Sequence, residues 1–136
     1  MMTANRDLSF FFNPKSIAVI GASPTQGKVG YNVLKNILDS GYSGKLYPIN
    51  PKAGQIKNIL GIKAYKTVLD VPKNIEIAIF VIPGNIVNDV AEECGKKGIK
   101  GLIIISAGFK EVGGEGVKRE LQLVQIAKQY LSLIHI

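Results

Sequence analysis

A loop of small residues at positions 21–30 has the composition and the position of an anion site. It reads GASPTQGKVG and joins an apolar segment to the start of a helical pattern. Free backbone N–H groups and the helix dipole at such a junction favour a phosphate. The loop therefore predicts a phosphate-binding turn, with Gly21, Ser23, Pro24, Thr25 and Gln26 as its candidate binding residues.

The loop departs from the two best-known phosphate motifs. A Walker A loop has four residues between its glycine and its Gly-Lys pair, followed by Ser or Thr. Here five residues separate Gly21 from Gly27 and Lys28, and Val29 follows. A dinucleotide G-x-G-x-x-G loop is also absent, because Ser23 stands where the second glycine belongs.

The end of the second predicted strand, residues 50–52, adds a cation. NAD-binding proteins place Asp or Glu there, on the ribose diol, whereas this chain has Asn-Pro-Lys. Lys52 suits a phosphorylated ribose, so NADP and coenzyme A (CoA) stay candidates and NAD recedes. Taken separately, each residue also has an explanation without a ligand. Gly21 and Gly30 would permit close packing of a helix against a strand, and Lys52 would be an ordinary solvent-exposed lysine. Together, on one edge of a sheet, they favour a phosphorylated nucleotide.

Alternating apolar and amphipathic segments predict the elements that position these residues. The strands have β-branched, continuous apolar runs, and the helices have apolar positions at helical spacing. Weaker patterns suggest a strand at 62–65 and a helical turn at 68–71. The strong predictions are strands at 16–20, 44–50, 75–82 and 100–106, and helices at 28–40, 87–97 and 116–130.

Strands this apolar must be covered on both faces, which predicts an α/β fold with a doubly wound, Rossmann-like parallel sheet. Ligands of such sheets bind beyond the carboxyl ends of the strands. Four loops rich in Gly, Pro, Ser or Asn meet there, at 21–30, 50–52, 82–85 and 106–111. The third loop adds Pro83 to the candidate binding residues.

Composition limits the remaining choices. The 136 residues, 46% of them hydrophobic, predict one globular domain over 1–136. One cysteine, Cys94, excludes an internal disulfide, and we expect a reducing cytoplasm. The start of the chain lacks a signal-peptide pattern, and the longest apolar runs are far short of the roughly 20 residues of a membrane helix. The net charge of +7 suits a polyanionic partner.

The loops resemble those of the CoA-binding domain of the ADP-forming acyl-CoA synthetases, the acetate–CoA ligase relatives of the succinyl-CoA synthetase alpha subunit. The resemblance extends from about residue 9 to about residue 130. It is carried by the stretches 11–23 (FFNPKSIAVIGAS), 27–30 (GKVG), 47–52 (YPINPK) and 105–111 (ISAGFKE).

The resemblance implies a role for each loop. Residues 23–26 would hold the CoA phosphates, Lys52 would approach the phosphorylated adenosine end, and Ile105, Ser106 and Ala107 would line the path of the pantetheine arm. Succinyl-CoA synthetases typically have Glu at the position of Ala107, so an acetyl or other acyl substrate fits better than succinate.

The family converts acyl-CoA, ADP and phosphate into carboxylic acid, ATP and CoA through a phosphohistidine in another domain. We therefore expect a fragment that binds CoA but is inactive alone, with the remaining domains or an ATP-grasp beta subunit as partner. Residues 131–136 do not match the family, which continues with a strand, so we expect the sheet to lack that strand. His135 has no carboxylate placed to orient it, and Cys94 lies beside Glu92 and Glu93, which disfavours a thiolate. We expect no catalytic residue in this chain and no metal site.

Three other functions stay open. A regulatory CoA-binding domain of a protein acetyltransferase would carry the same module, and sequence beyond residue 136 would separate the two. A basic nucleic-acid-binding protein would use the net charge, although the lysines are dispersed and only 7% of the residues are aromatic. An NADP-dependent reductase is disfavoured by the first loop and by the lack of a convincing proton donor.

Overall fold

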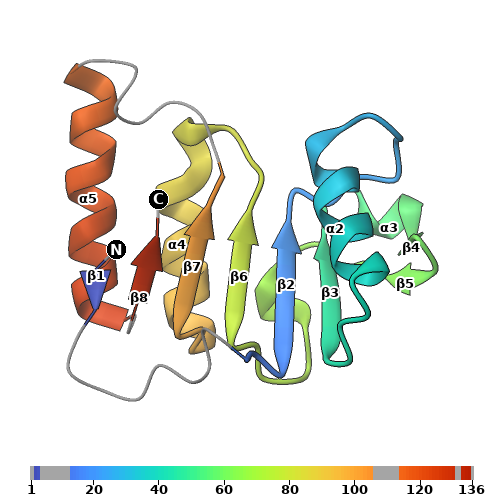
Figure 1. Cartoon of the computed structure of the whole chain (residues 1–136). Helices are drawn as coiled ribbons and strands as arrows, with labels where there is room; N and C mark the ends of the chain where they lie inside the picture. The colour runs from blue at the N-terminus through green and yellow to red at the C-terminus, as the bar shows by residue number, and fades with distance from the viewer. Residues whose placement is uncertain (1, 4–12, 106–113, 131–132, 136) are drawn as a thin grey trace.

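The computed structural model contains a six-stranded sheet in the order β1-β8-β7-β6-β2-β3 (Figure 1). The structure describes residues 2–3, 13–105, 114–130 and 133–135. The strands are β1 (Met2–Thr3), β2 (Ser16–Ile20), β3 (Lys45–Ile49), β6 (Ile77–Phe80), β7 (Gly101–Ile104) and β8 (Leu133–His135). All neighbours in this sheet pair in parallel except β1, which is antiparallel to β8.

The apolar composition of the central strand β2 is typical of a parallel sheet that helices cover on both faces. Its five residues, SIAVI, are all buried, and three of them are Ile or Val, whose branched side chains pack well on a pleated sheet. The hydroxyl of Ser16 donates to the carbonyl of Asn74, 3.1 Å away, and accepts from the N–H of Glu76 at 2.9 Å. The buried serine thus ties the start of β2 to the chain entering β6.

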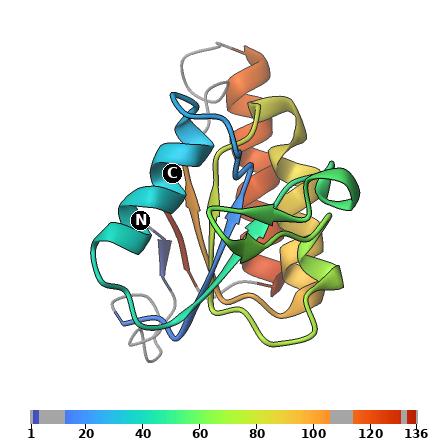
Figure 2. The same cartoon turned by 90° about the vertical axis from the view of Figure 1, so that its right-hand side faces the viewer.

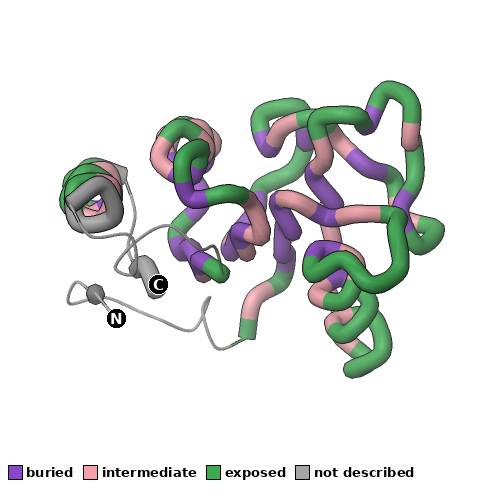
Figure 3. Tube along the Cα trace, turned by 90° about the horizontal axis from the view of Figure 1, so that it is seen from above, coloured by how far each residue is buried: buried purple, intermediate pink, exposed green. Residues whose placement is uncertain are grey.

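Helices cover the two faces of the sheet. Helix α2 (Val29–Asp39) lies on one face, and α4 (Gly84–Lys97) and α5 (Gly114–Tyr130) lie on the other (Figures 1 and 2). Leu34 of α2 packs with Val19, whereas Phe80 and Leu102 pack with Ala91 from α4. Buried residues therefore follow the sheet between the helices (Figure 3). The predicted doubly wound, Rossmann-like fold is confirmed.

A group of short elements connects β3 to β6, and we call residues 50–67 the α3 corner. It contains α3 (Ala53–Ile56), β4 (Asn58–Ile59) and β5 (Ile62–Lys63), and the 3₁₀ helix η1 (Val68–Asp70) follows. Tyr65 fastens the corner to the sheet, because its N–H donates to Pro48 and its carbonyl accepts from Asn50, both at 2.9 Å. The predicted turn at 68–71 is confirmed, and the predicted strand at 62–65 is shorter. Neither α3 nor β4 was expected.

The expectation of a sheet without its last strand was wrong. Residues Leu133–His135 form β8, which pairs in parallel with β7, Gly101 lying opposite Leu133. Three residues are enough because β7 and β1 each supply a ready hydrogen-bonding edge. Helix α4 also begins at Gly84 rather than at Val87. In the described part of the chain, no helix has both the length and the apolarity needed to cross a bilayer.

Candidate functional site

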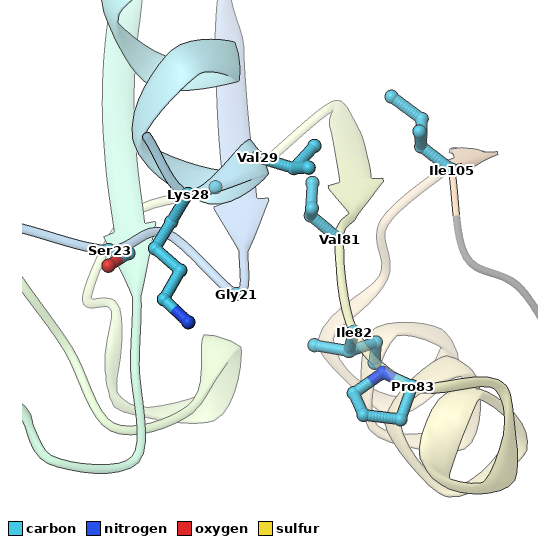
Figure 4. Close-up of a pocket in the computed structure, with 9 residues that line it drawn as sticks. Gly21, Ser23, Lys28, Val29, Val81, Ile82, Pro83 and Ile105 are labelled. Carbon is cyan, nitrogen blue, oxygen red and sulfur yellow. The ribbon is translucent and has the colours of Figure 1, made fainter. Parts of the chain in front are cut away.

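The order of the strands creates a crevice beside the end of β2. The chain leaves β2 for α2 on one face, and it leaves the neighbouring strand β6 for α4 on the opposite face. Loops that diverge in this way leave a ligand crevice at the carboxyl edge. A cavity of about 330 Å³ lies there, lined by Gly21, Ser23, Lys28, Val29, Gly30, Val81, Ile82, Pro83 and Ile105. Figure 4 shows Ser23 and Lys28 on one side of it and Ile82, Pro83 and Ile105 on the other.

Two glycines allow close backbone contacts at the end of β2. Gly21 has φ +96°, and a Cβ there would lie 2.1 Å from the carbonyl oxygen of Val81. A Cβ on Gly30 would lie 1.9 Å from the carbonyl oxygen of Gly21. Gly30 therefore allows α2 to pack closely against the end of β2, and Gly21 allows the end of β2 to approach the residue that follows β6.

The first turn of α2 is open to a ligand. Its N-cap, Lys28, has an extended backbone and makes no side-chain capping hydrogen bond. The turn before it is closed by the N–H of Thr25, which donates to the hydroxyl of Ser23 at 3.1 Å, and by the N–H of Lys28, which donates to the carbonyl of Thr25 at 3.2 Å. Backbone donors without an internal acceptor, next to a lysine, are the features that an anion requires.

Asn50 joins this loop to the α3 corner. Its side-chain amide donates to the carbonyl of Ala22 at 2.8 Å, and its side-chain oxygen accepts from the N–H of Lys52 at 2.8 Å. The backbone carbonyl of Asn50 also accepts from Ala53 at 2.9 Å. One side chain therefore sets the position of Lys52 relative to the phosphate loop.

Two smaller cavities continue along the same edge toward the α3 corner. One of about 190 Å³ is mainly apolar, with Ile49, Pro51, Val68, Ile82 and Ile86 in its wall. The other, of about 170 Å³, is lined by Pro51, Lys52, Gly54, Gln55 and Lys66. Pro51 and Lys66 belong to both walls. The edge thus offers an anion site, an apolar recess and a cationic recess in sequence.

The predicted binding residues are distributed over these features. Gly21, Ser23, Pro83 and Ile105 line the cavity of about 330 Å³, where Ile105 is 50% exposed. Pro24, Thr25 and Gln26 are exposed on the loop beside it, and Lys52 lines the cationic recess. Ser106 and Ala107 lie outside the described residues.

Sequence reasoning missed several residues of these walls. Lys28 and Val29 line the cavity of about 330 Å³ and Lys66 lines the cationic recess, although none of the three was selected. Lys28 had a signal, because it directly precedes the first residue of the helix. Lys66 had none, since the contact depends on how the α3 corner folds back.

Two titratable groups near the end of α4 have shifted pKa values. Cys94 is fully buried, and burial followed by the negative charge of Glu93 raises the pKa of its thiol far above the ordinary value. This agrees with the expectation that a thiolate is disfavoured at Cys94. Burial, then Asp89, raises the pKa of Glu93, which lines the apolar recess.

Comparison with known proteins gives one family. The chain matches the family described as CoA binding domain over residues 15–134. It is 51% identical over 124 residues to the alpha subunit of ADP-forming acetate–CoA ligase I from Pyrococcus furiosus, covering 90% of this chain and 27% of the relative. It is 55% identical over 118 residues to the ADP-forming 4-hydroxybutyrate–CoA ligase of Nitrosopumilus maritimus, covering 87% and 16%.

A solved structure agrees with these relatives. The apo dinucleotide-forming acetyl-coenzyme A synthetase 1 of Ca. Korarchaeum cryptofilum superposes with a TM-score of 0.84 at 42% identity, covering 91% of this chain and 26% of that one. The chain thus spans between 16% and 27% of the length of the two curated relatives named here. From its sequence and its fold, the chain belongs to the CoA binding domain family, and coenzyme A is its ligand.

Proposed function

We propose that this chain is the CoA-binding module of an ADP-forming acyl-CoA synthetase. The observation that carries the proposal is the group of three neighbouring sites along one sheet edge, which offer separate places for the pyrophosphate, the adenine and the ribose phosphate of CoA. The relatives named as ADP-forming CoA ligases support the enzyme class. We place the enzyme in the cytoplasm, where an unpaired cysteine such as Cys94 stays reduced.

In this proposal, CoA lies along the edge from the α3 corner toward β7. The pyrophosphate accepts hydrogen bonds from the open first turn of α2 and its loop, residues 23–26. The adenine occupies the apolar recess, and Lys52 pairs with the phosphate on the ribose. The pantetheine arm then passes Pro83 and Ile105; Ser106 and Ala107, which follow Ile105 in the sequence, lie outside the described residues and stay predicted binding residues.

Charge and shape both favour this direction. CoA carries about four negative charges when its phosphate monoester is ionised, and the chain has a net charge of +7. Apolar atoms dominate the recess assigned to the adenine, whereas the cationic recess lies beside it. An inverted ligand would place the uncharged pantetheine arm against Lys52. The lysine would then have no negative charge of CoA to pair with.

The module's part in the reaction is to hold CoA and present its thiol. In the whole enzyme, acyl-CoA, ADP and phosphate would give carboxylic acid, ATP and CoA. We assign the phosphohistidine and the nucleotide chemistry to the remaining domains or to an ATP-grasp beta subunit. The chain alone would bind CoA and release it unchanged.

Isothermal titration of the chain with CoA tests this function. We expect a dissociation constant on the order of micromolar and weaker binding of dephospho-CoA, because a lost phosphate removes a charge-assisted contact. NADP and ADP serve as controls and should bind more weakly than CoA. Absence of CoA binding, with steeply salt-dependent binding of single-stranded nucleic acid instead, would contradict the proposal.

A further inference from the structure

The cationic recess contains a second lysine whose role the proposed function does not yet use. Lys66 lies fourteen positions after Lys52 in the sequence, yet both line the same cavity of about 170 Å³. Both side chains are exposed, and in the described part of the chain neither ammonium takes part in a salt bridge. The recess therefore holds two positive charges that an anion can neutralise.

The end of the Lys66 side chain lies against Gly54, in the first turn of α3. A Cβ on Gly54 would lie 3.3 Å from Cε of Lys66 and 3.7 Å from its Nζ. The end of the lysine thus lies across the first turn of α3, directly after the turn that holds Lys52. The backbone of Lys52 is fixed in turn by Asn50.

Neighbouring lysines are placed differently. Lys63 has its ammonium 5.2 Å from the centre of the Tyr65 ring, where a cation–π interaction holds it. Lys57 ends α3 and is exposed, but it is absent from the walls of both recesses. Lys66 is the residue of this group that joins Lys52 in one wall.

One phosphate group of CoA is a suitable ligand for Lys52 and Lys66 together. A phosphate monoester carries about −1.5 to −2 charges at neutral pH, which one lysine only partly compensates. The internal pyrophosphate of CoA is assigned to the loop before α2, residues 21–30, which we call the α2 loop. The ribose phosphate is therefore the dianionic group left for the cationic recess. We propose that Lys66 is a second binding residue for the ribose 3′-phosphate of CoA, acting beside Lys52; this rests on the proposed direction of CoA along the edge.

The test compares CoA with dephospho-CoA on four forms of the chain by isothermal titration: wild type, Lys52→Met, Lys66→Met and Lys57→Met. Methionine keeps the length of the side chain and removes its charge. We expect Lys66→Met to weaken CoA binding roughly tenfold and dephospho-CoA binding less than about twofold, the scale of one charge-assisted hydrogen bond. Lys57→Met, which removes the same charge from the same corner, should change both affinities less than about twofold, the scale of a screened surface charge.

The outcomes separate this inference from the function on which it rests. If wild type binds no CoA, the proposed function fails and this inference with it. If wild type binds CoA and dephospho-CoA equally well, the assigned direction of CoA is wrong. If wild type discriminates but Lys66→Met weakens both ligands equally, weakens neither, or matches Lys57→Met, the role of Lys66 is overturned while the proposed function stands.

Discussion

The α2 loop and the α3 corner meet at the same edge of the sheet, but they are built on different principles. At the α2 loop, Gly21 and Gly30 bring two backbones together and leave N–H groups for the ligand. At the α3 corner, short elements carry Lys52 and Lys66, and the side chains supply the charge. Backbone recognition depends on geometry and tolerates no added atoms, whereas side-chain recognition tolerates substitution and responds to salt.

The largest expected effect comes from adding one methyl group to the α2 loop. Gly30→Ala puts a Cβ 1.9 Å from the carbonyl oxygen of Gly21, and both sides of this contact are backbone. We expect the free energy of unfolding to fall by at least about 3 kcal/mol, as overpacking against a rigid partner does. Urea unfolding followed by circular dichroism measures the change.

Gly27→Ala is the matched control in the same loop. Gly27 has φ +91°, and a Cβ there meets nothing within 4 Å. The substitution should cost about 1 kcal/mol, from backbone conformation alone. Equal losses for the two variants would show that conformation, and not the close approach of α2 to β2, governs the loop.

An intermediate effect is expected at Asn50, which links the two regions. Asn50→Ala leaves the carbonyl of Ala22 and the N–H of Lys52 without their present partners. We expect a loss of stability of about 1–2 kcal/mol. CoA and dephospho-CoA should both bind more weakly, because the α2 loop and the α3 corner each lose a hydrogen bond to Asn50. Titration of each ligand measures the two affinities.

Asn36→Ala, on the exposed surface of α2, controls for the loss of an asparagine side chain. It should leave stability within about 0.5 kcal/mol of wild type. Should Asn50→Ala weaken CoA while dephospho-CoA binds as before, Asn50 would belong to the α3 corner alone and would not connect it to the loop.

The smallest effect is that of salt, and it distinguishes the regions without a mutation. Raising the salt from about 0.05 M to about 0.5 M shortens the screening length from above 10 Å to below 8 Å. The preference for CoA over dephospho-CoA should shrink several-fold, because it depends on exposed lysines. Binding of dephospho-CoA should change less, and titrations at both salt concentrations give the comparison. A preference that does not change with salt would mean that the ribose phosphate is bound by buried or backbone donors.

The two regions also differ in how far sequence predicts them. The α2 side follows from local patterns: β2 is a continuous apolar run, α2 has helical spacing, and the loop between them is rich in glycine. The α3 corner depends on tertiary contacts. Its four-residue helix is too short for periodicity, and it begins where the carbonyl of Asn50 accepts from Ala53. Lys66 has no local signal because its neighbour in space, Gly54, lies twelve residues earlier.

The last strand was missed because the expectation rested on the family resemblance, which was traced only to about residue 130. Three residues cannot show a strand period, and β8 is specified by the edge of β7 that it meets. At the site, Gly21, Ser23 and Pro83 could be selected because all three follow strands that end at one edge, whereas Ile105 was selected from the family resemblance. The apolar recess could not, since its walls come from β3, η1 and α4 together.

The pairing of β1 with β8 has a consequence for the order of folding. Met2 lies opposite Ile134 and Thr3 opposite Leu133, so this contact closes nearly the whole chain into a loop. Such a long closure is entropically costly before the rest of the sheet exists. We therefore expect β2, β3 and β6 to assemble first and β1 to join last, with its amide hydrogens exchanging fastest of the six strands.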